Sequence, residues 1–211
     1  AYWEDGAQII APHDVNIIDH VNQIKGVESI KFQGNKELIQ IIGEDIDNEF
    51  LTAIKGLSLS PEAIERHKDL KIVYTPIHGT GVNLIPESLK NYGFQNIIHV
   101  PEQDVPSGNF PTVESPNPEV PSAMAMAITK AKETGADLVM ASDPDADRIG
   151  CVLRDAKGEY VLLNGNQIVM ILLYYIMTRN AELGRITGKE YIVKTIVTTE
   201  TIKSIAEKNN I

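Results

Sequence analysis

The alternation of strand-like and helix-like segments after residue 60 limits the fold more than any other feature of the sequence. Residues 70–75 form a short apolar segment of strand length, and the helical pattern that follows closes at Gly93. Strands separated by helices favour βαβ units, so we expect an α/β fold with three αβα layers around a mixed, mainly parallel sheet. The expected strands are residues 70–75, 94–100, 136–141, 149–154 and 159–163, and the expected helices begin at Pro61 behind a Ser60 cap and cover 82–92, 121–135 and 165–179.

The residues on either side of this alternation predict partial domains. Helical spacing at 13–24 and 44–57, with a weak strand at 28–32, gives the first stretch no clear core. A strand at 191–197 and a helix at 199–208 indicate another α/β unit. We therefore expect three parts, residues 1–58, 59–160 and 161–211. Since the chain has no initiator Met and ends on a helix without its onward strand, we also expect a piece of a longer polypeptide.

Composition excludes several classes of function. Hydrophobic residues make up 43% and charged residues 23%, which is typical of a globular protein. The net charge of −10, without a Lys/Arg cluster, argues against nucleic acid as a partner. No apolar segment reaches the roughly 20 residues that span a bilayer, so no membrane association is expected. The single cysteine, Cys151, excludes an intrachain disulfide and is compatible with the reducing cytoplasm, where we expect the protein.

Three carboxylates directly after the strand at 136–141 form the candidate site. Asp143, Asp145 and Asp147 alternate over five residues. Ligands of open α/β sheets bind beyond the carboxyl ends of strands, and a loop with this spacing can place three oxygens around one hard cation. Without a cation the three charges would repel one another. The alternative is a solvated acidic turn with Arg148 as its counter-charge.

Two other kinds of metal site match this loop less well. An EF-hand loop needs Gly at its sixth position and Glu at its twelfth, where this chain has Arg148 and Arg154. An aspartate-based phosphatase with a strand–Asp-x-Asp motif fits in part, but a third carboxylate, Asp147, follows the pair. A phosphatase-like site remains the second enzyme hypothesis.

Four motifs together resemble one family. Asp-Pro-Asp-Ala-Asp-Arg at 143–148 is similar to the magnesium loop of the α-D-phosphohexomutases, the phosphoglucomutases and phosphomannomutases, in the form found in their phosphopentomutase-like branch. The other three motifs occur in the family's order: Thr-Pro-Ile-His-Gly-Thr-Gly at 75–81, a proline-rich loop at 110–119, and Leu-Asn-Gly-Asn at 163–166. The resemblance implies that 59–160 is the second mutase domain with its metal loop, between the end of the first domain and the start of the third.

The resemblance also implies roles for individual residues. Asp143, Asp145 and Asp147 would ligate Mg²⁺, and Arg148 would be a catalytic phosphate contact unless it only pairs with an aspartate. His78 and Gly79, in a loop before a helix, would face the substrate phosphate. For His78 the alternative is a loop histidine bonded to neighbouring backbone.

The implied activity is intramolecular phosphotransfer between C1 and C6 of an aldohexose, or the equivalent positions of a pentose, through a phosphoserine and a sugar bisphosphate intermediate. The partners would be a sugar phosphate and the remaining domains of the parent chain. No Ser of this chain is followed by His, as in the family's Ser-His-Asn-Pro loop, and the sugar-selecting Gly-Glu-x-Ser loop is absent. We therefore expect these 211 residues to be inactive alone. The alternative outside catalysis is a freestanding metal-binding domain.

Overall fold

The computed structural model describes residues 2–209 and residue 211, in two compact units, Ala1–Gly43 and Glu44–Ile211. The first unit contains α1 (His13–Asn22) and the short 3₁₀ helices η1 (Val27–Ser29) and η2 (Lys36–Leu38). None of its described residues is buried. The strand predicted at 28–32 is wrong. Residues 27–29 form a helical turn instead, and the described residues of this unit offer no neighbouring strand to share the backbone hydrogen bonds of one.

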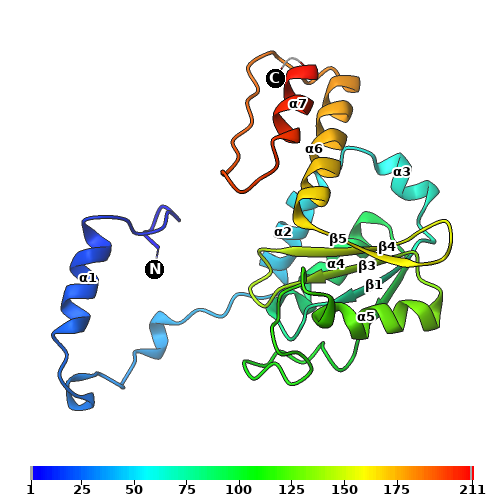
Figure 1. Cartoon of the computed structure of the whole chain (residues 1–211). Coiled ribbons are helices and arrows are strands. Elements are labelled where there is room, and N and C mark those ends of the chain that lie inside the picture. The colour runs from blue at the N-terminus through cyan, green and yellow to red at the C-terminus, as the bar shows by residue number, and fades with distance from the viewer. Residues whose placement is uncertain (1, 210) are drawn as a thin grey trace. The chain divides into compact units, whose positions relative to one another are not determined.

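The second unit is built on a mixed sheet (Figure 1). Its strands are β1 (Lys71–Thr75), β2 (Asn96–His99), β3 (Leu138–Ser142), β4 (Ile149–Arg154) and β5 (Tyr160–Leu163), in the order β2-β1-β3-β4-β5. β2 and β3 pair parallel to β1, while β4 is antiparallel to both β3 and β5. β4 therefore runs against the other four, which confirms the mixed, mainly parallel α/β sheet and the hairpin expected at 149–163.

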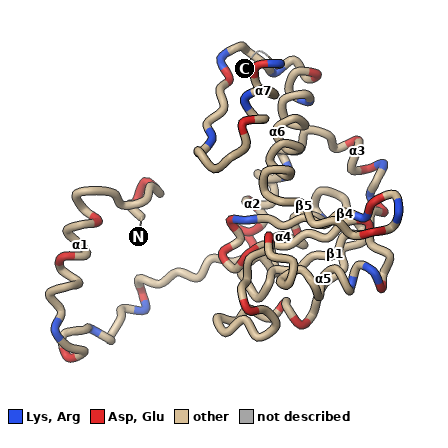
Figure 2. The backbone as a smooth tube through the Cα atoms, in the orientation of Figure 1, with Lys and Arg blue, Asp and Glu red and all other residues tan. Residues whose placement is uncertain are grey.

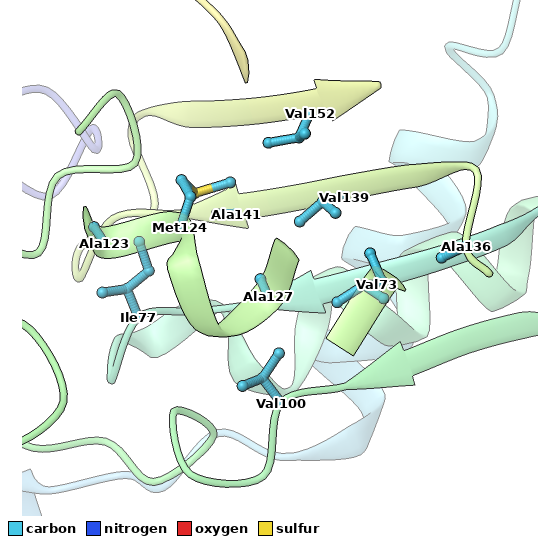
Figure 3. Close-up of a cluster of buried hydrophobic side chains, with 11 residues drawn as sticks. Val73, Ile77, Val100, Ala123, Met124, Ala127, Ala136, Val139, Ala141 and Val152 are labelled. Atoms are coloured by element: carbon cyan, nitrogen blue, oxygen red, sulfur yellow. The ribbon is translucent and has the colours of Figure 1, made fainter. Parts of the chain in front are cut away.

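One face of the sheet packs against α5 (Pro121–Thr134). Small residues repeat every fourth position along this helix, at Ala123, Ala127 and Ala131, and all three are buried. This spacing puts them on one side of the helix and lets its backbone approach the sheet closely. Together with Met124 of the same helix, they pack with apolar side chains from three strands and adjacent loops (Figure 3): Val73, Ile77, Val100, Ala136, Val139, Ala141 and Val152.

α4 (Leu84–Tyr92) covers the other face of the sheet. Along β1, Ile72 and Tyr74 alternate with Val73 and are buried. A Cβ at Gly81, just before α4, would overlap the Tyr74 hydroxyl and lie 2.9 Å from Ile85 Cδ1. The sheet is thus the middle of three αβα layers.

The remaining helices begin and end largely where their sequence signals place them. α2 (Glu44–Lys55) packs against α4, and its Ile54 carbonyl accepts a hydrogen bond of 2.7 Å from Tyr92. α6 (Gly165–Glu182) starts with a capping box between Asn164 and Gln167. The other helices of this unit are α3 (Pro61–Arg66), the 3₁₀ helix η3 (Thr80–Val82) and α7 (Thr201–Lys208).

Two predictions in this unit are corrected. Ser60 precedes α3 as expected, but its side chain does not cap the helix. The hydroxyl of Tyr175 in α6 instead donates to Ser60 Oγ at 2.9 Å. The strand predicted at 191–197 is absent, and Tyr191, Val193 and Ile196 are more than 80% exposed there. An extended segment needs a partner strand to become part of a sheet, and within the described residues this one pairs with none.

Charged residues are distributed over both units. Figure 2 shows Lys and Arg scattered along many elements and interspersed with Asp and Glu. Among the described residues, no helix has the length and apolar character needed to cross a membrane.

Candidate metal centre

The aspartate loop, residues 143–148, joins β3 to β4 at the carboxyl end of β3. Ser142 and Ile149 pair across the two strands and bring the ends of the loop together. The loop starts with a turn in which Ala146 N donates to the Asp143 carbonyl at 3.0 Å, with Pro144 in the position that proline favours. Ala146 has φ 61°, a left-handed conformation that is unusual for a residue with a Cβ.

The loop brings the three predicted ligands together. Asp143, Asp145 and Asp147 each offer a carboxylate oxygen, and these oxygens lie within 4.8 Å of one another. Around Mg²⁺, with bonds of about 2.1 Å, two oxygens can be up to about 4.2 Å apart, so small side-chain movements would complete such a set. An all-carboxylate set is also the oxygen chemistry that a hard divalent cation prefers. The residues therefore fit a magnesium ion.

The charges of the aspartate loop also favour a bound cation. The neighbouring carboxylates of Asp145 and Asp143 raise the pKa of Asp147. Burial of Asp143 opposes its ionisation, but hydrogen bonds from Arg148 outweigh burial and lower the pKa of this carboxyl. A cation placed among the three carboxylates would reduce their repulsion.

Arg148 lies beside the most buried of the three aspartates. Its backbone N–H donates to Asp143 Oδ1 at 2.9 Å and its Nε donates to Oδ2 at 2.6 Å. Nε is also 3.7 Å from Asp147 Oδ1. The side chain of Asp143 is fully buried, whereas that of Arg148 is 55% exposed. The pairing left open by the sequence is therefore present, and the exposed part of the guanidinium faces solvent.

The Thr-Pro-Ile-His-Gly-Thr-Gly loop, residues 75–81, packs directly against the aspartate loop. A Cβ at Gly79 would overlap the Pro144 Cα and lie 2.7 Å from its carbonyl oxygen, so only glycine fits this approach of two backbones. Thr80 donates twice to the Pro144 carbonyl, from its backbone N at 2.9 Å and from Oγ1 at 3.1 Å. Gly79 thus supports the aspartate loop, and its own N–H donates to the Pro76 carbonyl.

His78 lies in the interior of the same region. It is 3% exposed, its Nδ1 is 2.9 Å from the Val105 carbonyl and its Nε2 is 2.8 Å from Thr112 Oγ1. Both ring nitrogens are therefore engaged by neighbouring residues, which is the alternative that the sequence left open. His78 therefore holds the loop in shape, and the phosphate contact that the resemblance implies for it stays a prediction.

The backbone of this loop is strained. Ile77 and His78 have φ of 46° and 62°, values that cost a residue with a Cβ about 1–2 kcal/mol each. The Ile77 side chain is fully buried in the core under α5. Burial of Ile77 and the two hydrogen bonds of His78 hold the strained conformation in place.

Several residues that support the site were not predicted from the sequence. Gln103, in the loop between β2 and α5, is fully buried; its Oε1 accepts from Thr75 and its Nε2 donates to Thr112. Tyr74 and Ser142 share a buried hydrogen bond of 2.8 Å directly before Asp143. Burial raises the pKa of Tyr74 to about 12, so its hydroxyl stays protonated. No periodic pattern marks these residues, because each partner lies in a distant part of the chain.

Comparisons with known proteins identify the family and support the fold. A model of the phosphoglucomutase/phosphomannomutase alpha/beta/alpha domain II matches residues 48–158. A phosphoglucomutase of Staphylococcus aureus (strain N315) is 40% identical over 214 residues, and one of Staphylococcus haemolyticus (strain JCSC1435) is 32% identical over 215 residues. Each alignment covers 100% of this chain, but only 37% and 38% of the relative, respectively.

Solved structures support the fold alone. A phosphomannomutase-like protein of Thermus thermophilus is 20% identical, with a TM-score of 0.58 over 78% of this chain and 34% of that chain. A phosphoglucomutase/phosphomannomutase family protein of Burkholderia thailandensis is 22% identical, with a TM-score of 0.50 over 64% of this chain and 26% of that chain.

Proposed function

Because this chain belongs to the phosphoglucomutase/phosphomannomutase family, we propose that it contributes the metal loop of a Mg²⁺-dependent phosphosugar mutase. The observation that carries the proposal is the convergence of three carboxylate oxygens within 4.8 Å at the carboxyl end of β3. Asp143, Asp145 and Asp147 would hold the ion. When bound, Mg²⁺ would offset the charge on a phosphoryl group during its transfer.

Arg148 would bind the same phosphoryl group. Its Nε is fixed by Asp143, while the side chain remains 55% exposed. A planar guanidinium that is always charged suits phosphate oxygens, and the bond to Asp143 orients it before a phosphate arrives. In this proposal Arg148 binds and orients the phosphoryl group but does not carry it.

The phosphoryl carrier would be a serine outside these residues. The proposed net reaction moves a phosphoryl group between C1 and C6, or C5, of a sugar phosphate through a phosphoserine and a sugar bisphosphate. No Ser of the chain lies in a Ser-His motif, so these 211 residues would supply the cation site without the nucleophile. The proposed partners are a sugar phosphate and the other domains of such an enzyme, acting in the cytoplasm.

The proposed domain division follows from the same resemblance. The metal loop would belong to a second mutase domain at 59–160, between the end of the first domain at 1–58 and the start of the third at 161–211. The family model for domain II begins before this boundary, at residue 48.

The phosphatase alternative gains no support from the site. Both oxygens of Asp143 accept hydrogen bonds from Arg148, and these bonds lower the pKa of the carboxyl and with it the basicity that an aspartyl nucleophile needs. We therefore favour the ligand role for this carboxylate over a nucleophilic one.

Calorimetric titration of the 211-residue chain with Mg²⁺, and with Mn²⁺ as its analogue, tests the proposal. Asp145→Asn should weaken binding by at least about tenfold, since it removes one charged ligand of three. Asp69→Asn makes the same change of charge at an exposed residue before the amino end of β1 and should leave binding unchanged. Equal affinities for the Asp145 variant and the unaltered chain would remove the aspartate loop from consideration as the cation site.

A further inference from the structure

The carbonyl of Pro144 is held by two donors from a loop 64 residues earlier in the sequence. Thr80 N lies 2.9 Å and Thr80 Oγ1 lies 3.1 Å from this oxygen. A carbonyl oxygen has two lone pairs, so both can be used by Thr80. Pro144 stands between Asp143 and Asp145, and the direction of its carbonyl fixes the peptide plane from which Asp145 starts.

The loop that carries Thr80 is held in turn by a chain of buried and partly buried hydrogen bonds between side chains, which ends at a backbone carbonyl. Its first link is 2.7 Å, from Thr75 Oγ1 to Gln103 Oε1, and its second is 3.1 Å, from Gln103 Nε2 to Thr112 Oγ1. The third joins Thr112 Oγ1 to His78 Nε2 at 2.8 Å, and the last joins His78 Nδ1 to the Val105 carbonyl at 2.9 Å.

The chemistry of these groups assigns most of the donors in the chain. The Val105 carbonyl can only accept, so His78 Nδ1 carries a proton. Gln103 Nε2 donates to Thr112 Oγ1, which in turn shares a hydrogen bond with His78 Nε2. These polar groups are engaged with one another, as a rigid network requires. The conformation of residues 77 and 78 is therefore determined from within the domain.

We propose that Thr80 is a positioning residue of the cation site: its hydroxyl fixes the Pro144 carbonyl and thereby sets the geometry of Asp143 and Asp145 for a divalent cation. This inference rests on the proposed function of the aspartate loop. Thr80 would thus affect the affinity for the cation although it contacts neither the cation nor a carboxylate. Residues that orient metal ligands in this way affect binding although they lie outside the coordination sphere.

Two observations distinguish the positioning role of Thr80 from a role in packing. Thr80 is exposed, so loss of its hydroxyl leaves no buried polar group unpaired within the core. The backbone N–H of Thr80 still satisfies the Pro144 carbonyl without the hydroxyl. The second bond mainly restricts the direction of the peptide plane, and this restriction is what a cation site with three short-range ligands needs.

The test compares Thr80→Val and Thr80→Ser in the full 211-residue chain. Valine keeps the shape of threonine and removes the donor, whereas serine keeps the donor. Thr129→Val is the matched control, because Thr129 is also exposed and its Oγ1 donates to a backbone carbonyl, that of Ala125 in α5. Binding of Mn²⁺ is measured by calorimetry, and melting temperature is measured on the same samples.

Thr80→Val should raise the dissociation constant about two- to tenfold, while Thr80→Ser and Thr129→Val stay close to the unaltered chain. All three should melt within about 2 °C of it. Unchanged affinity in Thr80→Val, with the unaltered chain binding Mn²⁺, overturns the positioning role and leaves the proposed function standing. Absence of Mn²⁺ binding by the unaltered chain overturns both proposals.

Discussion

α1 and α5 both carry an apolar stripe at helical spacing, but only α5 buries it. In α1 the stripe includes Val15, Ile18 and Val21, which are each more than half exposed. In α5 the residues of the stripe, including Ala127 and Met124, are fully buried against the sheet. An amphipathic pattern therefore predicts that a helix forms, whereas its stability depends on the surface it can cover.

The aspartate loop is supported by the buried core of the second unit. It starts at a buried strand and rests on residues 77–80, which in turn rest on the core under α5. Residues 2–43 contain no buried side chain that could support such a site. Paired substitutions in the two units test this difference in burial.

The largest expected difference is between Met124→Ala and Val21→Ala. Met124 is fully buried and its truncation leaves a cavity, which should cost about 2–5 kcal/mol in the free energy of unfolding. Val21 is 52% exposed, so its truncation should change stability by no more than about 0.5 kcal/mol. Urea unfolding followed by circular dichroism measures both. Similar costs for the two variants would contradict the division into a packed and an unpacked unit.

A smaller difference is expected between Gly79→Ala and Gly34→Ala. A methyl group at Gly79 overlaps the Pro144 backbone, so the two loops must move apart at a cost of about 1–3 kcal/mol. The same displacement should weaken cation binding. At Gly34 a Cβ meets nothing within 4 Å, and alanine should be nearly neutral. Thermal unfolding and Mn²⁺ titration are the measurements, and a stable, fully binding Gly79→Ala would show that the close contact does not exist in solution.

The smallest expected effect is that of Ala146→Gly. The left-handed conformation of Ala146 costs about 1 kcal/mol, which glycine avoids, but glycine also loses more entropy on folding. We expect a change in the free energy of unfolding of less than about 1 kcal/mol, in the direction of higher stability. Differential scanning calorimetry resolves this. A loss of stability would mean that residue 146 does not hold a positive φ.

The sequence predicted the packed unit well because its signals are local. The apolar strand at β1, the turn glycines after α4 and α5, and the hairpin of β4 and β5 all depend on residues within a few positions. The two strands wrongly predicted, at 28–32 and 191–197, show what local signals cannot predict. β propensity and apolar alternation do not make a strand unless a partner accepts its hydrogen bonds.

The sequence predicted the three carboxylates of the candidate site but not the residues that support them. The spacing of Asp143, Asp145 and Asp147 is a local pattern, and the structure brings their oxygens together. The bond from Thr80 to Pro144 spans 64 residues, and Gln103 reaches back to Thr75 across 28. Such contacts follow from strand order, which a single sequence does not specify. For the same reason the sequence did not identify Val105 and Thr112 as the hydrogen-bond partners of His78.

Paramagnetic broadening by Mn²⁺ shows directly whether a cation binds at the aspartate loop. The isotope-labelled chain is titrated with substoichiometric Mn²⁺ while its amide NMR signals are followed. We expect signals from residues 143–148 and 79–81 to be lost first, while those of residues 155–158, at the other end of β4, persist. Loss starting instead at the acidic first turn of α2, with Glu44, Asp45 and Asp47, would contradict it.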